Sequence, residues 1–150
     1  MKRDSKIDSI ISGVTALTYN GTSSGKFYLN GVNTYSGATT ISGGTLAINK
    51  ATGLGTTGGA TTVSSGGALE ISGGITVAEP ITISGTGVSS GGAIAFTSGT
   101  NTYSGAITLA ADSTIKSTSG NQTISGAING AYVATITATD NLTLSGTIGA

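Results

Sequence analysis

Short sequence units recur along this chain, and their repetition is the strongest constraint on its fold. The hexapeptide NTYSGA occupies residues 33–38 and 101–106, and TISG occurs at 40–43, 82–85 and 123–126. Internal repetition is typical of solenoids, in which one unit cannot bury its apolar face alone and packs against its neighbours. The irregular spacing of the units indicates that loops of different length leave the coils at different points.

Within these units, apolar and polar residues alternate with a period of two. Such alternation places aliphatic side chains on one face of a strand and small or charged side chains on the other. Isoleucine, valine and threonine favour strands, and glycine permits tight corners. At about 20 to 24 residues per coil, residues 31–150 would form roughly five or six coils, in a rod about 25 to 30 Å long. The expected strands contain the pairs Leu69/Ile71, Ile81/Ile83, Ile94/Phe96, Ile107/Leu109 and Leu142/Leu144.

Composition narrows the class of protein. A length of 150 residues favours one domain, and a chain with 8% charged residues, one proline and many β-branched residues is unlike a disordered one. The formal net charge is zero, so no basic patch is expected for nucleic acid or for an anionic membrane. The sequence has no cysteine and no histidine, which excludes disulfides, thiolate or imidazole metal sites and a Ser-His-Asp relay.

The N-terminal residues differ from the rest, because five of the charged residues lie before residue 9. We expect residues 1–25 to form an N-terminal segment or cap and residues 26–150 to form the repeat domain. Asp4 and Asp8 interrupt the apolar run that a secretory signal requires, so no signal peptide is expected in this chain. An unstructured tail followed by a first strand is one interpretation of this segment. The other is a short capping helix, because the spacing of these residues is helical: Ile7, Ile10, Ile11 and Val14.

Residues 31–46, GVNTYSGATTISGGTL, resemble the autotransporter-associated β-strand repeat, also called the passenger-associated transport repeat, of bacterial surface and secreted passenger domains. Residues 99–109, GTNTYSGAITL, resemble a second copy, although AAD follows where the family has a glycine-rich turn. The resemblance implies a right-handed parallel β-helix (β-solenoid) that forms the stalk or body of an exported protein, and it implies no catalytic motif. It depends on Gly31, Asn33, Thr34, Tyr35, Ser36, Gly37, Thr39, Thr40, Gly44, Thr45 and Leu46.

Paired carboxylates are the first candidate for a catalytic site, because parallel β-helices also host polysaccharide lyases and glycosidases. Glycoside hydrolysis needs two carboxyl groups within about 5 to 10 Å of each other. Glu70 could lie beside Glu79 on neighbouring strands, and Asp112 could lie within one or two coils of Asp140. No basic or aromatic residue is interleaved with these acids, so we interpret them as solvated positions and turn caps.

Other polar and aromatic residues suggest binding roles or structural ones. Tyr35 and Tyr103 occupy equivalent positions, where they would either form an aromatic ladder for a sugar ring or, as we favour, cover the core. The calcium repeat GGxGxD is absent, and TITAT at 135–139 is one local fit to an ice-binding threonine array. We therefore assign no catalytic, cofactor-binding or metal-binding residues, and expect no cofactor and no enzymatic activity. Amide ladders are expected from Asn33, Asn49, Asn101 and Asn121.

These observations predict a structural or adhesive β-helix of a bacterial cell-surface or secreted protein, acting as a stalk or as a self-stacking filament subunit. A β-helix end exposes a coil of unpaired backbone groups. We therefore expect end-to-end self-association or continuation of a longer β-helix, with a surface glycan or host receptor as a further partner. No nucleic-acid partner and no membrane span are expected. The alternative is a carbohydrate-binding or polysaccharide-degrading module, and ice binding is a third hypothesis.

Overall fold

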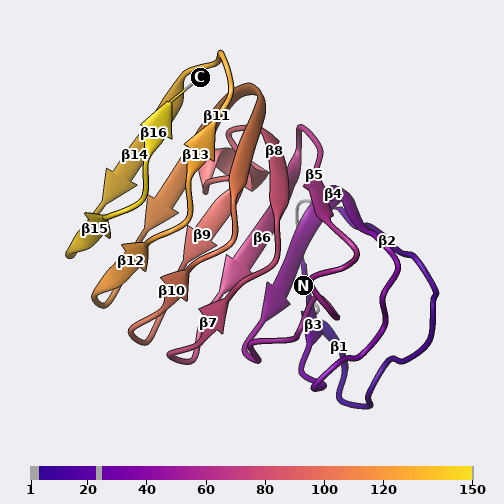
Figure 1. Ribbon diagram of the computed structural model, residues 1–150. Coiled ribbons are helices and arrows are strands. Elements are labelled where there is room, and N and C mark those ends of the chain that lie inside the picture. The colour runs from indigo at the N-terminus through magenta and orange to yellow at the C-terminus, as the bar shows by residue number, and fades with distance from the viewer. Residues whose placement is uncertain (1–3, 23–24, 150) are drawn as a thin grey trace.

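The computed structural model describes residues 4–22 and 25–149, which form a β-solenoid of stacked parallel strands (Figure 1). This confirms the predicted parallel β-helix. The strands are β1 (Ser5–Ile7), β2 (Leu17–Asn20), β3 (Lys26–Leu29), β4 (Thr39–Ile48), β5 (Thr61–Val63), β6 (Gly67–Ile71), β7 (Thr76–Val77), β8 (Ile81–Gly85), β9 (Ile94–Phe96), β10 (Thr102–Tyr103), β11 (Ile107–Ser117), β12 (Gln122–Ile124), β13 (Ile128–Asn129), β14 (Ala134–Ala138), β15 (Leu142–Leu144) and β16 (Ile148–Gly149).

The strands stack on three faces. The first face contains β2, the start of β4, β5, β8, the start of β11, β13 and β16. The second face contains β1, β3, the end of β4, β6, β9, the end of β11 and β14. The third face contains β7, β10, β12 and β15. Seven stacked strands at a spacing of about 4.8 Å make a rod of about 29 Å.

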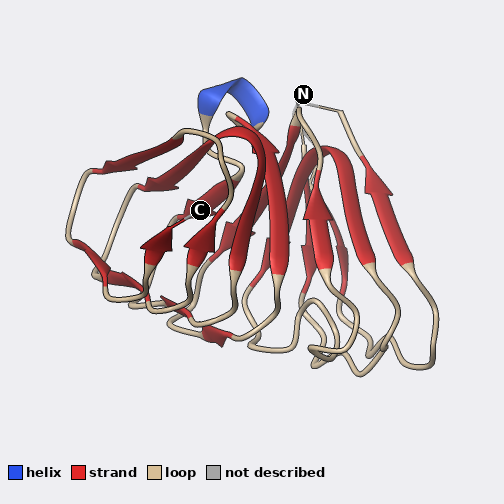
Figure 2. Ribbon diagram, turned by 45° about the horizontal axis from the view of Figure 1, so that its top comes forward, coloured by secondary structure: helices blue, strands red, loops and turns tan. Residues whose placement is uncertain are grey.

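Loop length varies from coil to coil, although the pairing of the strands stays parallel. Lys26 pairs with Thr45, 19 positions later, whereas Ile81 pairs with Ile107, 26 positions later. The extra residues leave the solenoid as loops, as the irregular spacing of the repeats predicted. One such loop, between β8 and β9, contains a short 3-10 helix, Val88–Ser90, on the outside of the solenoid (Figure 2).

The core is a thin stack of aliphatic side chains in register. Residues that pair across neighbouring coils point to the same side, so their side chains contact each other along the axis. Full burial of each such side chain contributes about 1.5–3 kcal/mol, so the stability is spread along the rod. One row on the first face consists of Ile41, Val63, Ile83 and Leu109, and one on the second face consists of Leu46, Leu69, Ile94 and Ile115, all at most 5% exposed.

The alternative of an N-terminal capping helix is wrong. Residues 5–7 form β1, in which Ser5 pairs with Phe27 and Ile7 pairs with Leu29. The open edge of β3 explains this outcome, because its backbone N–H and C=O groups would stay unpaired beneath a helix. The division into residues 1–25 and 26–150 stays a prediction; β1 and β2 belong to the same sheet as the strands that follow them.

Candidate functional site

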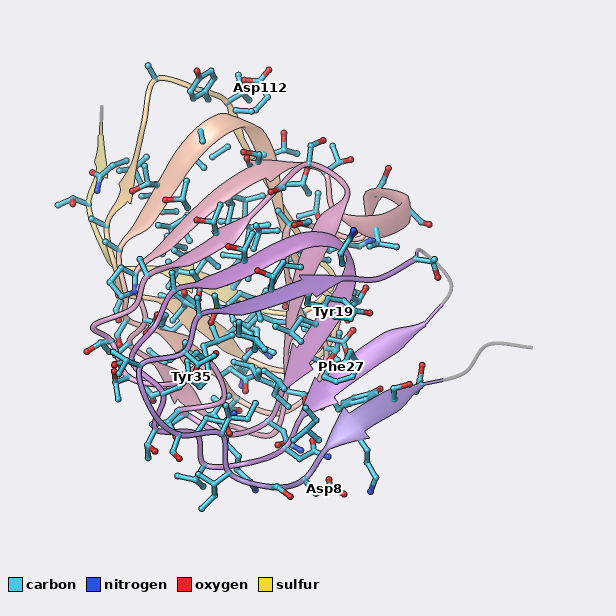
Figure 3. All side chains as sticks on the ribbon, turned by 90° about the vertical axis from the view of Figure 1, so that its right-hand side faces the viewer. Asp8, Tyr19, Phe27, Tyr35 and Asp112 are labelled. Atoms are coloured by element: carbon cyan, nitrogen blue, oxygen red, sulfur yellow. The ribbon has the colours of Figure 1, made fainter. Side chains whose placement is uncertain are left out.

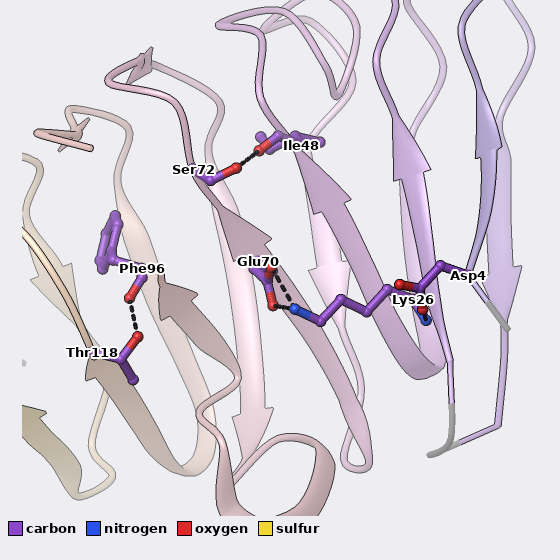
Figure 4. Close-up of polar contacts among 7 residues, drawn as sticks. All are labelled: Asp4, Lys26, Ile48, Glu70, Ser72, Phe96 and Thr118. Carbon is purple, nitrogen blue, oxygen red and sulfur yellow. Dashed lines mark hydrogen bonds and ion pairs between the residues drawn. The ribbon is translucent and has the colours of Figure 1, made fainter. Parts of the chain in front are cut away.

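Glu70 lies on the outer side of β6 and forms an ion pair with Lys26 of β3. The Lys26 ammonium donates a hydrogen bond to Oε1 of Glu70 at 2.7 Å and forms an ion pair with Oε2 at 2.6 Å (Figure 4). Burial by itself lowers the pKa of Lys26, but the hydrogen bond and charge of Glu70 leave that pKa above its ordinary value. Because Glu70 is only 9% exposed and fully paired, the expectation of a solvated carboxylate is wrong here.

Glu79 lies at the corner between the third and first faces and is 3% exposed. Neither oxygen of its carboxyl has a hydrogen-bond partner. Burial raises the pKa of this carboxyl to about 7. Glu70 projects outward from the second face, so the two glutamates do not form a catalytic pair, and the expected solvated position is wrong for Glu79 as well.

The two aspartates behave as the turn caps that we expected. The Asp112 carboxylate accepts a hydrogen bond from the backbone N–H of Val133 at 2.9 Å, and the Asp140 carboxylate accepts one from Gly120 at 3.0 Å. Asp112 lies where β11 turns from the first face to the second, at the periphery of the view along the axis (Figure 3). Asp140 follows the far end of β14, so the length of that strand, about 16 Å, separates Asp140 from the turn at which Asp112 lies. The four acids therefore do not form the carboxylate pair of a glycosidase.

Both tyrosines of the repeated hexapeptide lie inside the solenoid, fully shielded from solvent. The Tyr35 hydroxyl shares a hydrogen bond of 2.6 Å with the Thr39 hydroxyl, and the Tyr103 hydroxyl donates to the carbonyl oxygen of Glu79 at 2.7 Å. Burial, with a smaller contribution from the charge of Glu79, raises the pKa of Tyr103. An external aromatic ladder for sugars is therefore absent at these positions, and both rings cover the core as we expected.

The asparagines of the hexapeptides bind the backbone of the preceding coil. The Asn33 Oδ1 atom accepts from the N–H of Ile11 at 2.9 Å. The Asn101 Oδ1 atom accepts from Gly74 and Ile75 at 2.9 and 3.0 Å, while its amide donates to Gln122 Oε1 at 2.9 Å. The contribution of Gln122 was missed in the sequence analysis; its position 21 residues after Asn101, close to one coil length, is the signal that could have found it.

Of the remaining predicted amide positions, one forms a ladder and one does not. Asn141 donates to the Asn121 side chain at 3.0 Å, across one coil. The side-chain oxygen of Asn49 is buried and has no hydrogen-bond partner. Amide stacking therefore occurs at some coil corners only.

Outward threonines form one row on the first face. The paired positions Thr18, Thr40, Thr62, Thr82 and Thr108 belong to successive coils. A second row, which a flat ice-binding array would need, does not form around residues 135–139: in the preceding coil, Lys116 rather than threonine pairs with Thr137. The described residues also contain no group of three acidic side chains that could hold a metal ion.

Two of the hollows in the described structure lie beside a glutamate side chain and are candidate binding sites. One, of about 250 Å³, lies beside the Lys26–Glu70 pair and beneath the loop that contains Ser89. The other, of about 340 Å³, lies between residues 51–57 and 76–79 and is lined by Glu79. The second hollow combines an open cavity with a buried, unpartnered carboxyl, and it was not among the predicted sites. The signal was available, since AEP at 78–80 replaces the SGA found at 36–38, 104–106 and 125–127.

Comparison with known proteins finds a family similarity for one segment of the chain. Residues 17–48 match the model of the Passenger-associated-transport-repeat family. The chain carries a passenger-associated transport repeat. The matched repeat begins at β2 and ends with β4, so it spans one coil and the strand that bends into the next. This confirms the resemblance seen at residues 31–46.

The other comparisons add no relatives to this repeat protein. No curated protein and no solved structure matches the chain. Within the described part of the chain, no helix has the length and apolar character needed to cross a bilayer. The passenger-associated transport repeat and the β-solenoid together indicate a surface β-helix of the passenger type.

Proposed function

We propose that the protein is a structural rod, a stalk or body segment of a bacterial cell-surface or secreted protein, and that its coils continue end to end into further coils. Where a second copy of the chain supplies the next coil, the product is a filament. The family of residues 17–48 supports an exported protein of this kind. Adhesion to a surface glycan or a host receptor belongs to the same proposal.

The exposed apolar row of the last coil carries this proposal. Ile128 is 3% exposed, whereas its partner Ile148 in the next coil is 64% exposed. Ile124 is 1% exposed and its partner Leu144 is 37% exposed. These side chains continue the core rows, but no described strand pairs on the far side of this coil, so each of its strands is paired along one edge.

The first coil offers the complementary surface. Among the described residues, β1 pairs only with β3 and β2 pairs only with β4, so their outer edges present backbone groups that no described strand pairs with. Strand edges of this kind are templates for further parallel pairing. The strands of both terminal coils run in the same direction, so a head-to-tail contact between copies would preserve the parallel arrangement and would form an open rod rather than a closed dimer.

Sedimentation velocity and negative-stain microscopy at low and high protein concentration test this proposal. We expect rods whose length grows with concentration, and an Ile148→Lys variant that stays short because the ammonium would be buried in the contact. Val32→Lys is the matched control, because Val32 is 54% exposed on an inner coil. Short, monodisperse particles at high concentration, or equal shortening by both variants, would contradict end-to-end stacking.

A further inference from the structure

Backbone pairing on the third face is interrupted between residues 51–57 and β7. On the far side of β7, Thr102 and Ser104 donate from their N–H groups to the carbonyl oxygens of Ile75 and Val77, at 2.9 and 2.8 Å. Alternate residues of a strand direct their backbone groups to opposite sides, so the N–H and C=O groups of residues 76 and 78 face residues 51–57. No hydrogen bond joins these two fully described segments, and β7 is the edge strand of its sheet (Figure 1).

This interruption is local, because pairing on the third face resumes in the preceding coil. The N–H of Thr56 donates to the carbonyl of Tyr35 at 2.9 Å, and the N–H of Thr34 donates to Ile11 at 2.9 Å. The missing pairs coincide with the cavity of about 340 Å³, which residues 51, 52 and 54–57 line from one side and residues 76, 78 and 79 from the other. We call this cavity the third-face cavity.

Glu79 stands at a corner where neighbouring coils have glycine. An added Cβ at Gly59, Gly105, Gly126 or Gly146 would clash with the backbone of the coil before it, and for Gly105 the clashing atom is the carbonyl oxygen of Glu79. The corner thus excludes side chains except where the third-face cavity provides space. The carboxyl of Glu79 is shielded from water and unpartnered, and the nearest phenols, those of Tyr35 and Tyr103, bond elsewhere.

The third-face cavity therefore combines hydrogen-bond donors and acceptors that have no partners in the protein. The backbone N–H groups of residues 76 and 78 are donors, their carbonyls and the Glu79 carboxylate are acceptors, and the lining threonine hydroxyls can act as either. The Glu79 carboxyl is buried, and a buried polar group is costly to leave unpaired, whereas Thr76 and Ala78 are exposed, so a ligand can reach their backbone groups from solvent. A bare cation would satisfy the acceptors and leave the N–H groups unpaired, whereas a ring that carries several hydroxyls can satisfy both.

We propose that the third-face cavity binds one polyhydroxylated ring, either a free monosaccharide or the terminal sugar of a glycan. A volume of about 340 Å³ lies at the lower end of the range for ligand pockets, about 300–1,000 Å³, which suits one ring. The N–H groups of Thr76 and Ala78 donate to ring hydroxyls. Glu79 turns its carboxylate into the cavity and accepts from two neighbouring hydroxyls, and the exposed side chain of Ala51 contacts the C–H groups of the ring.

Amide chemical-shift mapping of the isotope-labelled protein tests the proposal. The probes are a panel of methyl glycosides and a set of short oligosaccharides that end in the same sugars, all at pH 8, where Glu79 is ionised. We expect shifts at Thr76, Ala78 and residues 51–57 for at least one sugar. Shifts with both probe types would identify a terminal sugar as a ligand, and shifts with methyl glycosides alone would identify a free monosaccharide.

Matched carboxyl variants show whether Glu79 holds the ligand. Glu79→Gln is expected to weaken binding by about tenfold or more, because the neutral amide loses the charge-assisted hydrogen bonds. Glu70→Gln changes a carboxyl outside the cavity and is expected to bind as the wild type does. Equal affinities of the Glu79→Gln variant and the wild type would overturn the proposal, as would the absence of shifts at both segments for every sugar. The assay is independent of rod length, so its failure leaves end-to-end stacking intact.

Discussion

The stability of this solenoid should fall as the pH rises through neutrality, because of Glu79. Its carboxyl has a pKa of about 7 in the folded protein and an ordinary value of 4.5 when unfolded. The folded state therefore binds more protons than the unfolded state between these values. The stability that Glu79 contributes is fully present below pH 4.5 and is lost as the pH rises through about 7.

The magnitude follows from the difference between the two pKa values. A difference of about 2.5 units corresponds to about 3 kcal/mol of unfolding free energy. Glu79 is 3% exposed and has no cationic partner, so solvent screening leaves this figure largely intact. A loss of about 3 kcal/mol is a large part of the stability of a typical domain, about 5–15 kcal/mol.

The assay is urea unfolding followed by circular dichroism at a series of pH values between 4.5 and 8.5, for the wild type and for Glu79→Gln. The other carboxylates are common to both proteins, so their titration cancels in the difference. We expect the variant to gain about 3 kcal/mol relative to the wild type across this range. Asp140→Asn is the control, since this carboxylate is exposed. If the difference between wild type and Glu79→Gln stays constant within about 0.5 kcal/mol, the reasoning about burial is refuted.

Two further predictions concern the contacts between coils. Asn101→Ala should lower the unfolding free energy by about 2 to 4 kcal/mol, because it removes the acceptor of the part-buried N–H groups of Gly74 and Ile75 and leaves the buried Gln122 amide without its partner. Asn141→Ala at the exposed ladder should cost less than about 1 kcal/mol. Urea unfolding measures both, and similar losses would contradict the role of the buried amide. Gly105→Ala should lower the unfolding free energy by about 3 kcal/mol, because the added Cβ clashes with the backbone of the preceding coil. Gly58 has space for a Cβ, so the unfolding free energy of Gly58→Ala should stay within about 0.5 kcal/mol of the wild type. A Gly105→Ala variant as thermally stable as the wild type would show that the corner can shift.

Local alternation was sufficient to predict the core, because the inward residues are the apolar ones of each strand. Ile81 and Ile83 were paired in sequence and both are buried in the structure. The secondary structure of the N-terminal segment could not be predicted from its sequence for a physical reason. A short apolar run such as Ile7 to Ile11 fits the spacing of a helix, and it equally fits a strand followed by a turn. The open edge of β3 favours the strand over the helix, because β1 can pair with it. That edge forms only in the tertiary structure, so no local sequence pattern predicts it.

To predict the third-face cavity from the sequence, one would have to compare successive coils, because no local motif indicates it. Residues 51–57 lie on the third face in the coil before β7, and no backbone hydrogen bond joins them to β7. Loop conformation follows from packing, so the missing hydrogen bonds could not be predicted from residue types. The sequence shows glutamate at position 79 where the other repeats have glycine. The importance of this difference becomes clear only when the register of the coils is known.

The direction of the hydrogen bonds has a mechanical consequence. Backbone bonds between coils run along the rod axis, as the pairing of successive coils shows. Tension applied to the two ends therefore loads one layer of bonds at a time, and the rod should peel layer by layer under low force, while it resists bending and compression through its stacked rows. The described layer beside β7 lacks the third-face bonds that the other layers have, so rupture under load should begin there.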